Sequence, residues 1–228
     1  MNLTDTASVA SLLSLIGLIP IAYNAGLQIR DRRRRQRSQL LRQSTFSTWQ
    51  IVRPSYEGHM ARVEDVIACQ TITSRLAALK CTSSVVDHGR AILASANTVL
   101  VCGPKANALS KDIVDQIKLP IEIDTTKAPP QIVDRNRAQV YVSPMDNGEK
   151  ADLAVFGRVH VSDVPVYLLW GLHGTGTIAA AKAFASDELL SNALKKTGGR
   201  DFVGVLYVPY GTVDDVGEPE WLVPPITA

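Results

Sequence analysis

The residues best suited to chemistry form a short loop rich in glycine and threonine around one histidine. The loop comprises Gly171, Leu172, His173, Gly174, Thr175, Gly176 and Thr177. An apolar run, residues 164–170, precedes it, and small residues, 178–185, follow, so it connects a predicted strand to a predicted helix. Such a turn aims backbone N–H groups and a helix N-terminus at an anion. We therefore predict that this loop, apart from Leu172, contacts a phosphate or another polar ligand. The alternative is a tight turn whose glycines let the helix pack on the sheet.

His173 is also the candidate acid or base if the site is catalytic, because an imidazole titrates near neutral pH. We assign Asp146 as its catalytic partner, and Asp152 is the other candidate. The sequence fixes neither a nucleophile nor a carboxylate beside the histidine. Binding is therefore favoured over catalysis.

A second turn, residues 103–107, follows the predicted strand 98–102. Gly103 permits close backbone approach, Lys105 can pair with a phosphate, and Asn107 can cap the next helix while facing the site. The turn matches neither of the common glycine-rich nucleotide-binding patterns, so an ordinary strand-to-helix turn is the alternative. Asp124 lies 21 positions after Gly103, where dinucleotide-binding folds place an acid that contacts ribose. A plain loop aspartate is the alternative for this residue.

Strands and helices alternate from residue 97 onward. Strands are predicted at 98–102, 121–124, 138–142, 152–161, 164–170 and 202–208, and helices at 108–118, 178–185 and 187–196. This alternation predicts an α/β fold, a three-layer Rossmann-like sandwich with a mainly parallel sheet. Because ligands bind at the carboxyl ends of such strands, the two turns and a third cluster, from Ser143 to Asp146, should share one rim. Ser143 is therefore a further predicted ligand contact. Residues 44–95 are predicted to be helical, 125–134 a loop, and the tail 209–228 a surface wrap.

Residues 7–27 carry no charge and can cross a hydrocarbon core of about 30 Å as a helix. A cluster of arginines between residues 30 and 42 follows, which places the N-terminus outside the cell and the remainder in the cytoplasm. We therefore predict a single-pass protein of the cell membrane. Its parts are an N-terminal transmembrane helix (1–29), a basic juxtamembrane helix or linker (30–57) and a cytoplasmic domain (58–228) with a helical lead-in (58–96). A cleaved signal peptide and an interfacial or soluble helix are the alternatives.

The distribution of charge and the number of cysteines limit the kinds of partner and ligand that the chain can bind. The net charge is +2, but residues 28–42 alone carry +6, and residues 43–228 carry −3. A mildly acidic domain lacks the basic face that nucleic acids require, so the arginines are expected to meet anionic lipid instead. Three cysteines at unrelated spacings indicate neither a disulfide framework nor a metal site. Self-association through residues 44–95 is left open, although no sustained heptad supports a homo-oligomer.

Two segments also carry a resemblance. Residues 99–107 read VLVCGPKAN and residues 171–177 read GLHGTGT. Together they resemble a group of uncharacterised bacterial Rossmann-like proteins, in which a strand ending in CGPK or GGP and an asparagine is followed by a G-x-H-x-x-G-(S/T) loop. More distantly, residues 97–185 are similar to Rossmann-like sensor domains of prokaryotic defence systems, which bind or process nucleotides. The chain lacks the usual glycine pattern and the acidic motif of nucleotide-hydrolysing relatives.

The leading hypothesis is a membrane-anchored cytoplasmic domain that binds a nucleotide or a nucleotide-derived ligand, in signalling or defence. One alternative is a hydrolase of the same fold that cleaves an N-glycosidic or phosphate bond with His173 and Asp146. Another is a protein-interaction module without a small ligand. The sequence identifies no cofactor.

Overall fold

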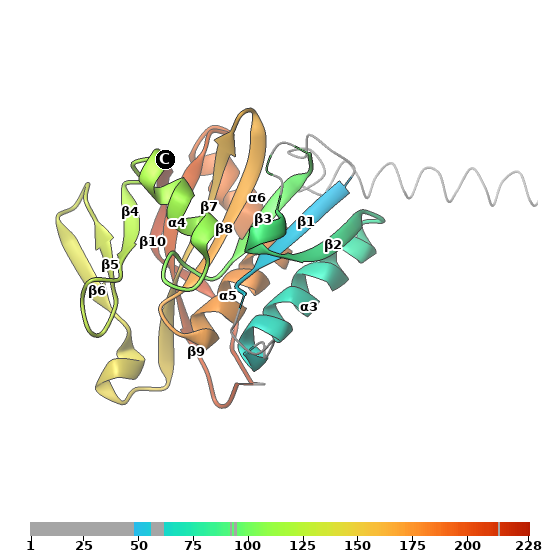
Figure 1. Cartoon of the computed structure of the whole chain (residues 1–228). Helices are drawn as coiled ribbons and strands as arrows, with labels where there is room; N and C mark the ends of the chain where they lie inside the picture. The colour runs from blue at the N-terminus through green and yellow to red at the C-terminus, as the bar shows by residue number, and fades with distance from the viewer. Residues whose placement is uncertain (1–47, 56–61, 92, 94, 214) are drawn as a thin grey trace, which may run out of the picture. The chain divides into compact units, whose positions relative to one another are not determined.

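The computed structural model describes residues 48–55, 62–91, 93, 95–213 and 215–228 (Figure 1). Contacts divide the chain into two units, Met1–Arg42 and Gln43–Ala228, and every element described below belongs to the second. The predicted membrane span and arginine cluster lie outside the described residues. Within the described residues, no helix has the length and apolar character needed to cross a membrane.

The described residues form a large mixed sheet at the centre of the unit. Its seven strands lie in the order β10-β9-β7-β8-β3-β1-β2. Three neighbouring pairs are parallel and three are antiparallel, and five of the seven strands run in the same direction. The sheet is therefore mainly parallel, as predicted. The strands are β1 (Thr48–Arg53), β2 (Thr82–Asp87), β3 (Asn97–Val101), β7 (Ala151–Val161), β8 (Val164–Gly171), β9 (Phe202–Pro209) and β10 (Glu220–Thr227).

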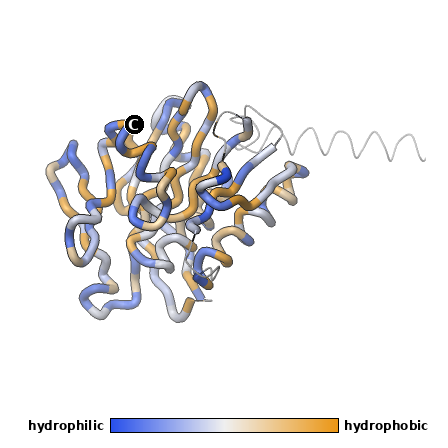
Figure 2. Tube along the Cα trace, in the orientation of Figure 1, coloured by the Kyte–Doolittle hydropathy of each residue, from blue (hydrophilic) through white to orange (hydrophobic). Residues whose placement is uncertain are grey.

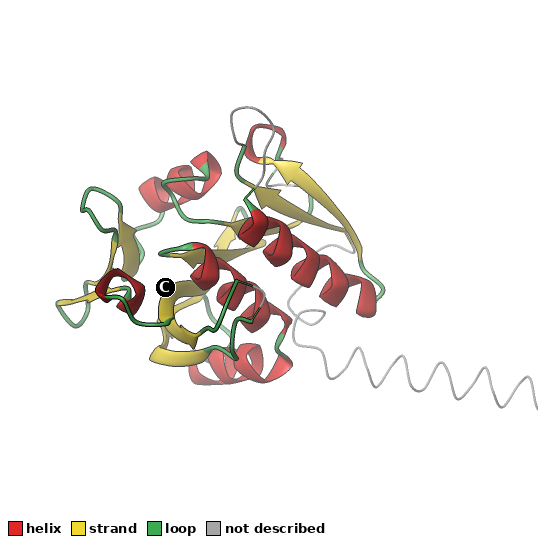
Figure 3. Ribbon diagram, turned by 90° about the horizontal axis from the view of Figure 1, so that it is seen from below, coloured by secondary structure: helices red, strands yellow, loops and turns green. Residues whose placement is uncertain are grey.

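Helices α3 (Val63–Ala78) and α5 (Gly174–Ala185) pack side by side on one face of this sheet (Figure 3). An aromatic cluster joins α5 to the strands, because the ring of Trp49 lies 5.9 Å from those of Tyr167 and Phe184, centroid to centroid. Helix α6 (Asp187–Lys196) follows α5, and the Ser186 hydroxyl accepts the N–H of Leu189 as its cap. Gly198 and Gly199 then end it with positive φ angles, as the sequence predicted.

The opposite face is covered by α4 (Ala108–Gln116) and a small antiparallel sheet of β4 (Ile121–Asp124), β5 (Gln131–Asp134) and β6 (Gln139–Val142). Ile113 of α4 and Ile121 of β4 share a buried cluster with Leu100 and Val155 of the large sheet. Hydrophobic residues gather along the strands of that sheet (Figure 2). The unit is thus a mixed α/β fold of Rossmann-like character, whose third layer is partly a second sheet.

The prediction of a helical stretch over residues 44–95 was wrong at both ends. β1 lies inside the large sheet between β2 and β3, so a domain boundary at residue 58 would remove an interior strand. Trp49, Ile51 and Val52 are fully buried there. β2 replaces the predicted second helix, and its polar residues Thr82, Ser83 and Ser84 hide the alternation that marks a half-buried strand. α3 confirms the helix expected between them.

Three further expectations need correction. Strands β4 and β6 belong to the small sheet and not to the parallel one, and β5 occupies part of the segment predicted to be a loop. The tail does not wrap the surface, because β10 pairs with β9 at the sheet edge, where its prolines are tolerated. Trp221 of β10 stacks on Phe156 at 5.9 Å between centroids. The predicted hairpin of β7 and β8 is confirmed, with Ser162 and Asp163 at positive φ in its turn.

Candidate functional site

A cavity of about 750 Å³ opens at the carboxyl ends of β1, β3 and β8. The chain leaves β1 through α3 toward β2 at one edge, but it leaves β3 through α4 and the small sheet toward the hairpin of β7 and β8 on the other side. Adjacent strands whose connections diverge in this way form the crevice where open α/β sheets bind ligands. The cavity therefore lies where this fold class places its sites.

The two predicted turns meet in this cavity. Gly103 and Lys105 line it from the first turn, and the second turn contributes Gly171, His173, Gly174, Thr175 and Thr177. Lys105 is exposed, and no ion pair is found for its ammonium group among the described residues. The adjacency of the turns thus agrees with the prediction, while ligand contact stays a prediction.

The N-terminus of α5 is already occupied by a carboxylate of the protein itself. Asp152, at the start of β7, is fully buried. Its Oδ2 accepts the N–H of Gly176 at 2.6 Å and the hydroxyl of Thr175 at 2.8 Å. Its Oδ1 accepts the hydroxyl of Ser143 and the N–H of Leu153, each at 2.7 Å. An acidic side chain at a helix N-terminus is favourable, and here it takes the place predicted for an external anion.

The glycines of this loop are required by packing. A Cβ on Gly171 would lie 2.2 Å from the backbone nitrogen of Thr177, and one on Gly176 would lie 2.4 Å from the carbonyl oxygen of Leu153. A Cβ on Gly174 would lie 2.4 Å from Cγ of Glu64, so the Glu64 side chain rests against the first residue of α5. This agrees with the alternative stated for the loop, that its glycines let the helix approach the sheet.

Asp146 lies beside His173. It belongs to the 3₁₀ turn η3 (Pro144–Asn147), and its Oδ1 is 3.0 Å from Nε2 of His173. That separation suits an ion pair, but the two groups are not aligned as in a hydrogen bond, and Nε2 is buried. Asp152, the other candidate partner, has its oxygens engaged at the α5 N-terminus. The pairing of His173 with Asp146 is therefore the one that the fold permits.

Three residues predicted to contact a ligand make hydrogen bonds within the protein, and their contact with a ligand stays a prediction. Asn107 is fully buried; it caps α4 by accepting the N–H groups of Leu109 and Ser110, and its amide donates to the carbonyls of Val52 and Val101. Its predicted capping role is confirmed.

Ser143 is likewise buried, with its hydroxyl donated to Asp152 and accepting the N–H of Met145. Asp124 ends β4 of the small sheet and not a parallel strand. Its carboxylate accepts the hydroxyl and the N–H of Thr126, and these hydrogen bonds hold the pKa of Asp124 below its ordinary value. Its neighbours Ile123 and Thr125 line the cavity.

Sequence reasoning missed a buried thiol and a carboxylate in the cavity wall. The Cys102 thiol donates to Oδ1 of Asp65 at 2.9 Å, and both side chains are buried. Burial, and then the adjacent Asp65 carboxylate, raise the pKa of Cys102. Cys102 also has φ of 70°, a left-handed conformation that is uncommon outside glycine and recurs at functional sites.

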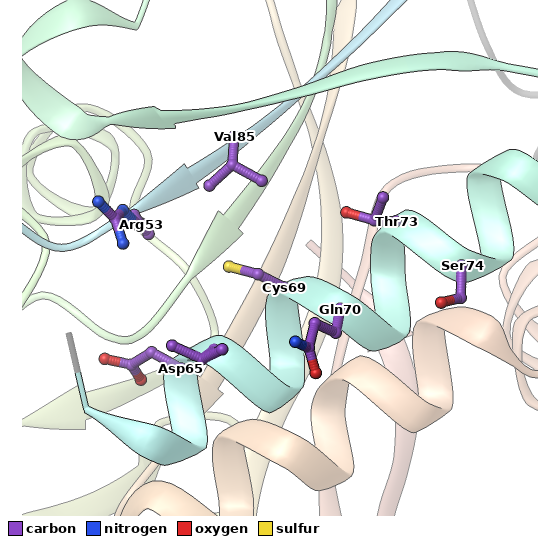
Figure 4. A pocket seen from close by; sticks show the side chains of 8 residues that line it. Arg53, Asp65, Cys69, Gln70, Thr73, Ser74 and Val85 are labelled. Carbon is purple, nitrogen blue, oxygen red and sulfur yellow. The ribbon is translucent and has the colours of Figure 1, made fainter.

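A smaller cavity of about 330 Å³ lies between α3 and strands β1 and β2 (Figure 4). Arg53, Cys69 and Val85 line it, and Asp65 lines both cavities. Burial raises the pKa of Cys69 to about 11, and the Asp65 carboxylate adds to the shift. Asp65 therefore separates two cavities and lies close to two protonated thiols.

Further residues of the large cavity went unpredicted, among them Arg62, Glu64 and Tyr210. Arg62 and Glu64 belong to the start of α3, and recognising β1 as a strand would have placed that helix start on the rim. No group of three or more histidine, cysteine or acidic side chains able to hold a metal occurs in the described part of the chain. Comparison with protein-family models and with curated proteins finds no match for this sequence.

Proposed function

We propose that the unit Gln43–Ala228 binds a nucleotide or a nucleotide-derived ligand in the large cavity. The observation that carries the proposal is that the Lys105 turn and the His173 loop line one cavity at the carboxyl ends of β3 and β8. Its volume of about 750 Å³ falls within the range of small-molecule sites. Lys105 would receive a phosphate, and Tyr210 offers an aromatic surface for a base.

The N–H groups of Gly174 and Thr175 support polar recognition as well. They open α5, where an intrahelical acceptor is missing, and no acceptor is found for them within the described segments. A ligand oxygen could accept both. The N–H of Gly176, by contrast, already donates to Asp152.

The binding proposal is tested by the thermal stability of the purified full chain with NAD, nucleosides and their phosphates. A ligand that binds the folded state raises the melting temperature by mass action. We expect stabilisation by at least one nucleotide and its loss in Lys105→Ala and His173→Ala, with Lys118→Ala as the matched control on an exposed surface. Stabilisation that survives both substitutions would place the ligand elsewhere. Absence of any effect would favour the interaction module.

A second candidate, hydrolysis of an N-glycosidic or phosphate bond, is favoured by the 3.0 Å separation of His173 and Asp146. The imidazole would take a proton from an attacking water while the carboxylate orients it and stabilises its charged form. Product formation from the bound nucleotide, lost in both His173→Ala and Asp146→Asn, would support an enzyme. Stabilisation without turnover would support a sensor.

We also propose that residues 7–27 anchor the unit to the cell membrane with residues 43–228 in the cytoplasm, as in a signalling or defence protein. Support comes from the length of the uncharged run and the arginines after it. Full-length protein should stay in the membrane fraction after a high-salt wash and leave it in detergent. Recovery in the soluble fraction would contradict the anchor.

A further inference from the structure

The charge distribution around the large cavity is unusual for a site expected to hold phosphates. Helix α5 begins at the cavity, where Asp152 accepts the N–H of Gly176 and the side chain of Glu64 rests against Gly174. Two carboxylates therefore lie at the N-terminus of α5, whose field could otherwise attract an anion. At the neighbouring turn, Asn107 accepts the N–H groups that open α4.

The acidic and basic side chains that line the cavity are equal in number. Glu64 is half-buried and Asp65 is buried, and both line the cavity together with the cations Lys105 and Arg62. Arg62 is engaged in an interaction within the protein. A di- or triphosphate would bring several negative charges within a few ångströms of the two acids, and like charges at that range repel strongly in a partly dehydrated site. One phosphate beside Lys105 avoids this conflict.

Carboxylates are acceptors, so their presence indicates what else the ligand carries. An ionised glutamate offers its oxygens to hydroxyl or amino donors and has no donor of its own. For Glu64, no hydrogen bond or ion pair is found among the described residues. A ribose diol or an exocyclic amine would supply donors for it.

We infer that the cavity selects nucleosides and nucleoside monophosphates over di- and triphosphates, with Glu64 accepting from the sugar or base and Lys105 receiving the single phosphate. This inference rests on the proposed function and narrows its ligand class. Glu64 thereby acts as the specificity-determining residue, because it supplies both the acceptor and the repulsion. The proposal also departs from the phosphate-cradling role that the glycine-rich loop suggested.

The test measures dissociation constants of the full chain for adenosine, AMP, ATP and their guanosine counterparts, with EDTA present so that no cation masks the phosphates. We expect one monophosphate to bind tightest and its triphosphate to bind at least about tenfold more weakly, a difference of about 1.4 kcal/mol. Glu64→Gln should tighten triphosphate binding about tenfold and so narrow the gap. Lys105→Met should weaken the monophosphate to the level of its nucleoside and leave the nucleoside unchanged.

The matched control is Glu220→Gln, which removes an exposed carboxylate from β10 at the far edge of the sheet. It should leave all the constants unchanged. Triphosphates that bind as tightly as monophosphates, or Glu64→Gln behaving like the control, would overturn the inference and leave the proposed function standing. If none of the six compounds binds, the proposed function fails and the inference fails with it.

Discussion

The two turns on the cavity rim differ in which residue accepts the free N–H groups of the helix that follows. Each precedes a helix, and each helix begins with N–H groups that need acceptors. In the first turn the acceptor is local, because Asn107 caps the helix that directly follows it. In the second turn the acceptor is distant in sequence. Asp152 of β7 accepts the N–H of Gly176, which lies 24 residues later in the chain.

The glycines of the two turns also differ in the space around them. Gly103 has space, since a Cβ there would meet its nearest atom, the flexible Cδ1 of Ile123, at 3.3 Å. Gly171 has none, since backbone atoms lie within 2.3 Å of its Cβ position. The turn richer in glycine is therefore the more tightly built, and the plainer one holds the exposed lysine. Glycine content alone did not indicate where an anion could enter.

The largest effect is expected from Asp152→Ala. Four donors would lose their acceptor, and buried unsatisfied donors are costly, so the free energy of unfolding should fall by about 4 kcal/mol. Urea denaturation followed by circular dichroism measures it. Asp112→Ala, which removes an exposed carboxylate from α4, serves as the control. A loss below about 1 kcal/mol would show that Asp152 does not hold the α5 N-terminus.

A smaller but clear contrast is expected between the two glycines. Gly171→Ala should cost about 3 kcal/mol, because its Cβ would overlap backbone that cannot move freely. Gly103→Ala should cost under about 1 kcal/mol, because the side chain of Ile123 can shift. The same denaturation measurement compares them. Equal costs would remove the distinction between the two turns.

Asn107→Ala tests the local cap. Loss of the cap and of the amide donors to Val52 and Val101 should lower the free energy of unfolding by about 2 kcal/mol. Asn147→Ala, at the exposed end of η3, is the control. The affinity for the ligand, measured under conditions where the variant is fully folded, should be unchanged. A loss of ligand affinity in Asn107→Ala but not in the control would show that Asn107 contributes to ligand binding.

The smallest expected effect is the pH dependence of stability that the Cys69 thiol contributes. The pKa of Cys69 is raised from 9.0 to about 11, so above pH 9 the unfolded chain gives up this proton while the folded chain keeps it. Stability from this group is complete below pH 9 and falls as the pH rises toward 11. At pH 10 the loss should be about 1 kcal/mol relative to Cys69→Ala. Cys81→Ala is the control, and identical pH profiles for all three proteins would contradict the prediction.

Much of the fold could be predicted where local chemistry decides it. Ser186, Asn107 and the Gly198-Gly199 pair mark helix ends through contacts a few residues away, and the hairpin turn at Asp163 follows from its own dipeptide. β1 and β2 were missed because partners distant in sequence stabilise them. β2 is polar on both faces, and β10 carries two prolines.

The candidate site divides in the same way. The meeting of the Lys105 and His173 turns follows from the rule that ligands bind at strand carboxyl ends, so it could be predicted. The placement of Asp152 beneath α5 and of Glu64 against Gly174 depends on tertiary packing, so it could not. Asp124 was misplaced because its strand joined a different sheet.

The central claim is that the two turns form one ligand site. Hydrogen–deuterium exchange of the full chain, with and without the nucleotide that stabilises it most, tests this claim directly. The account predicts slower exchange in both segments, 103–106 and 171–175, with little change in α6 or β10. Protection of one segment alone, or of neither, would contradict it.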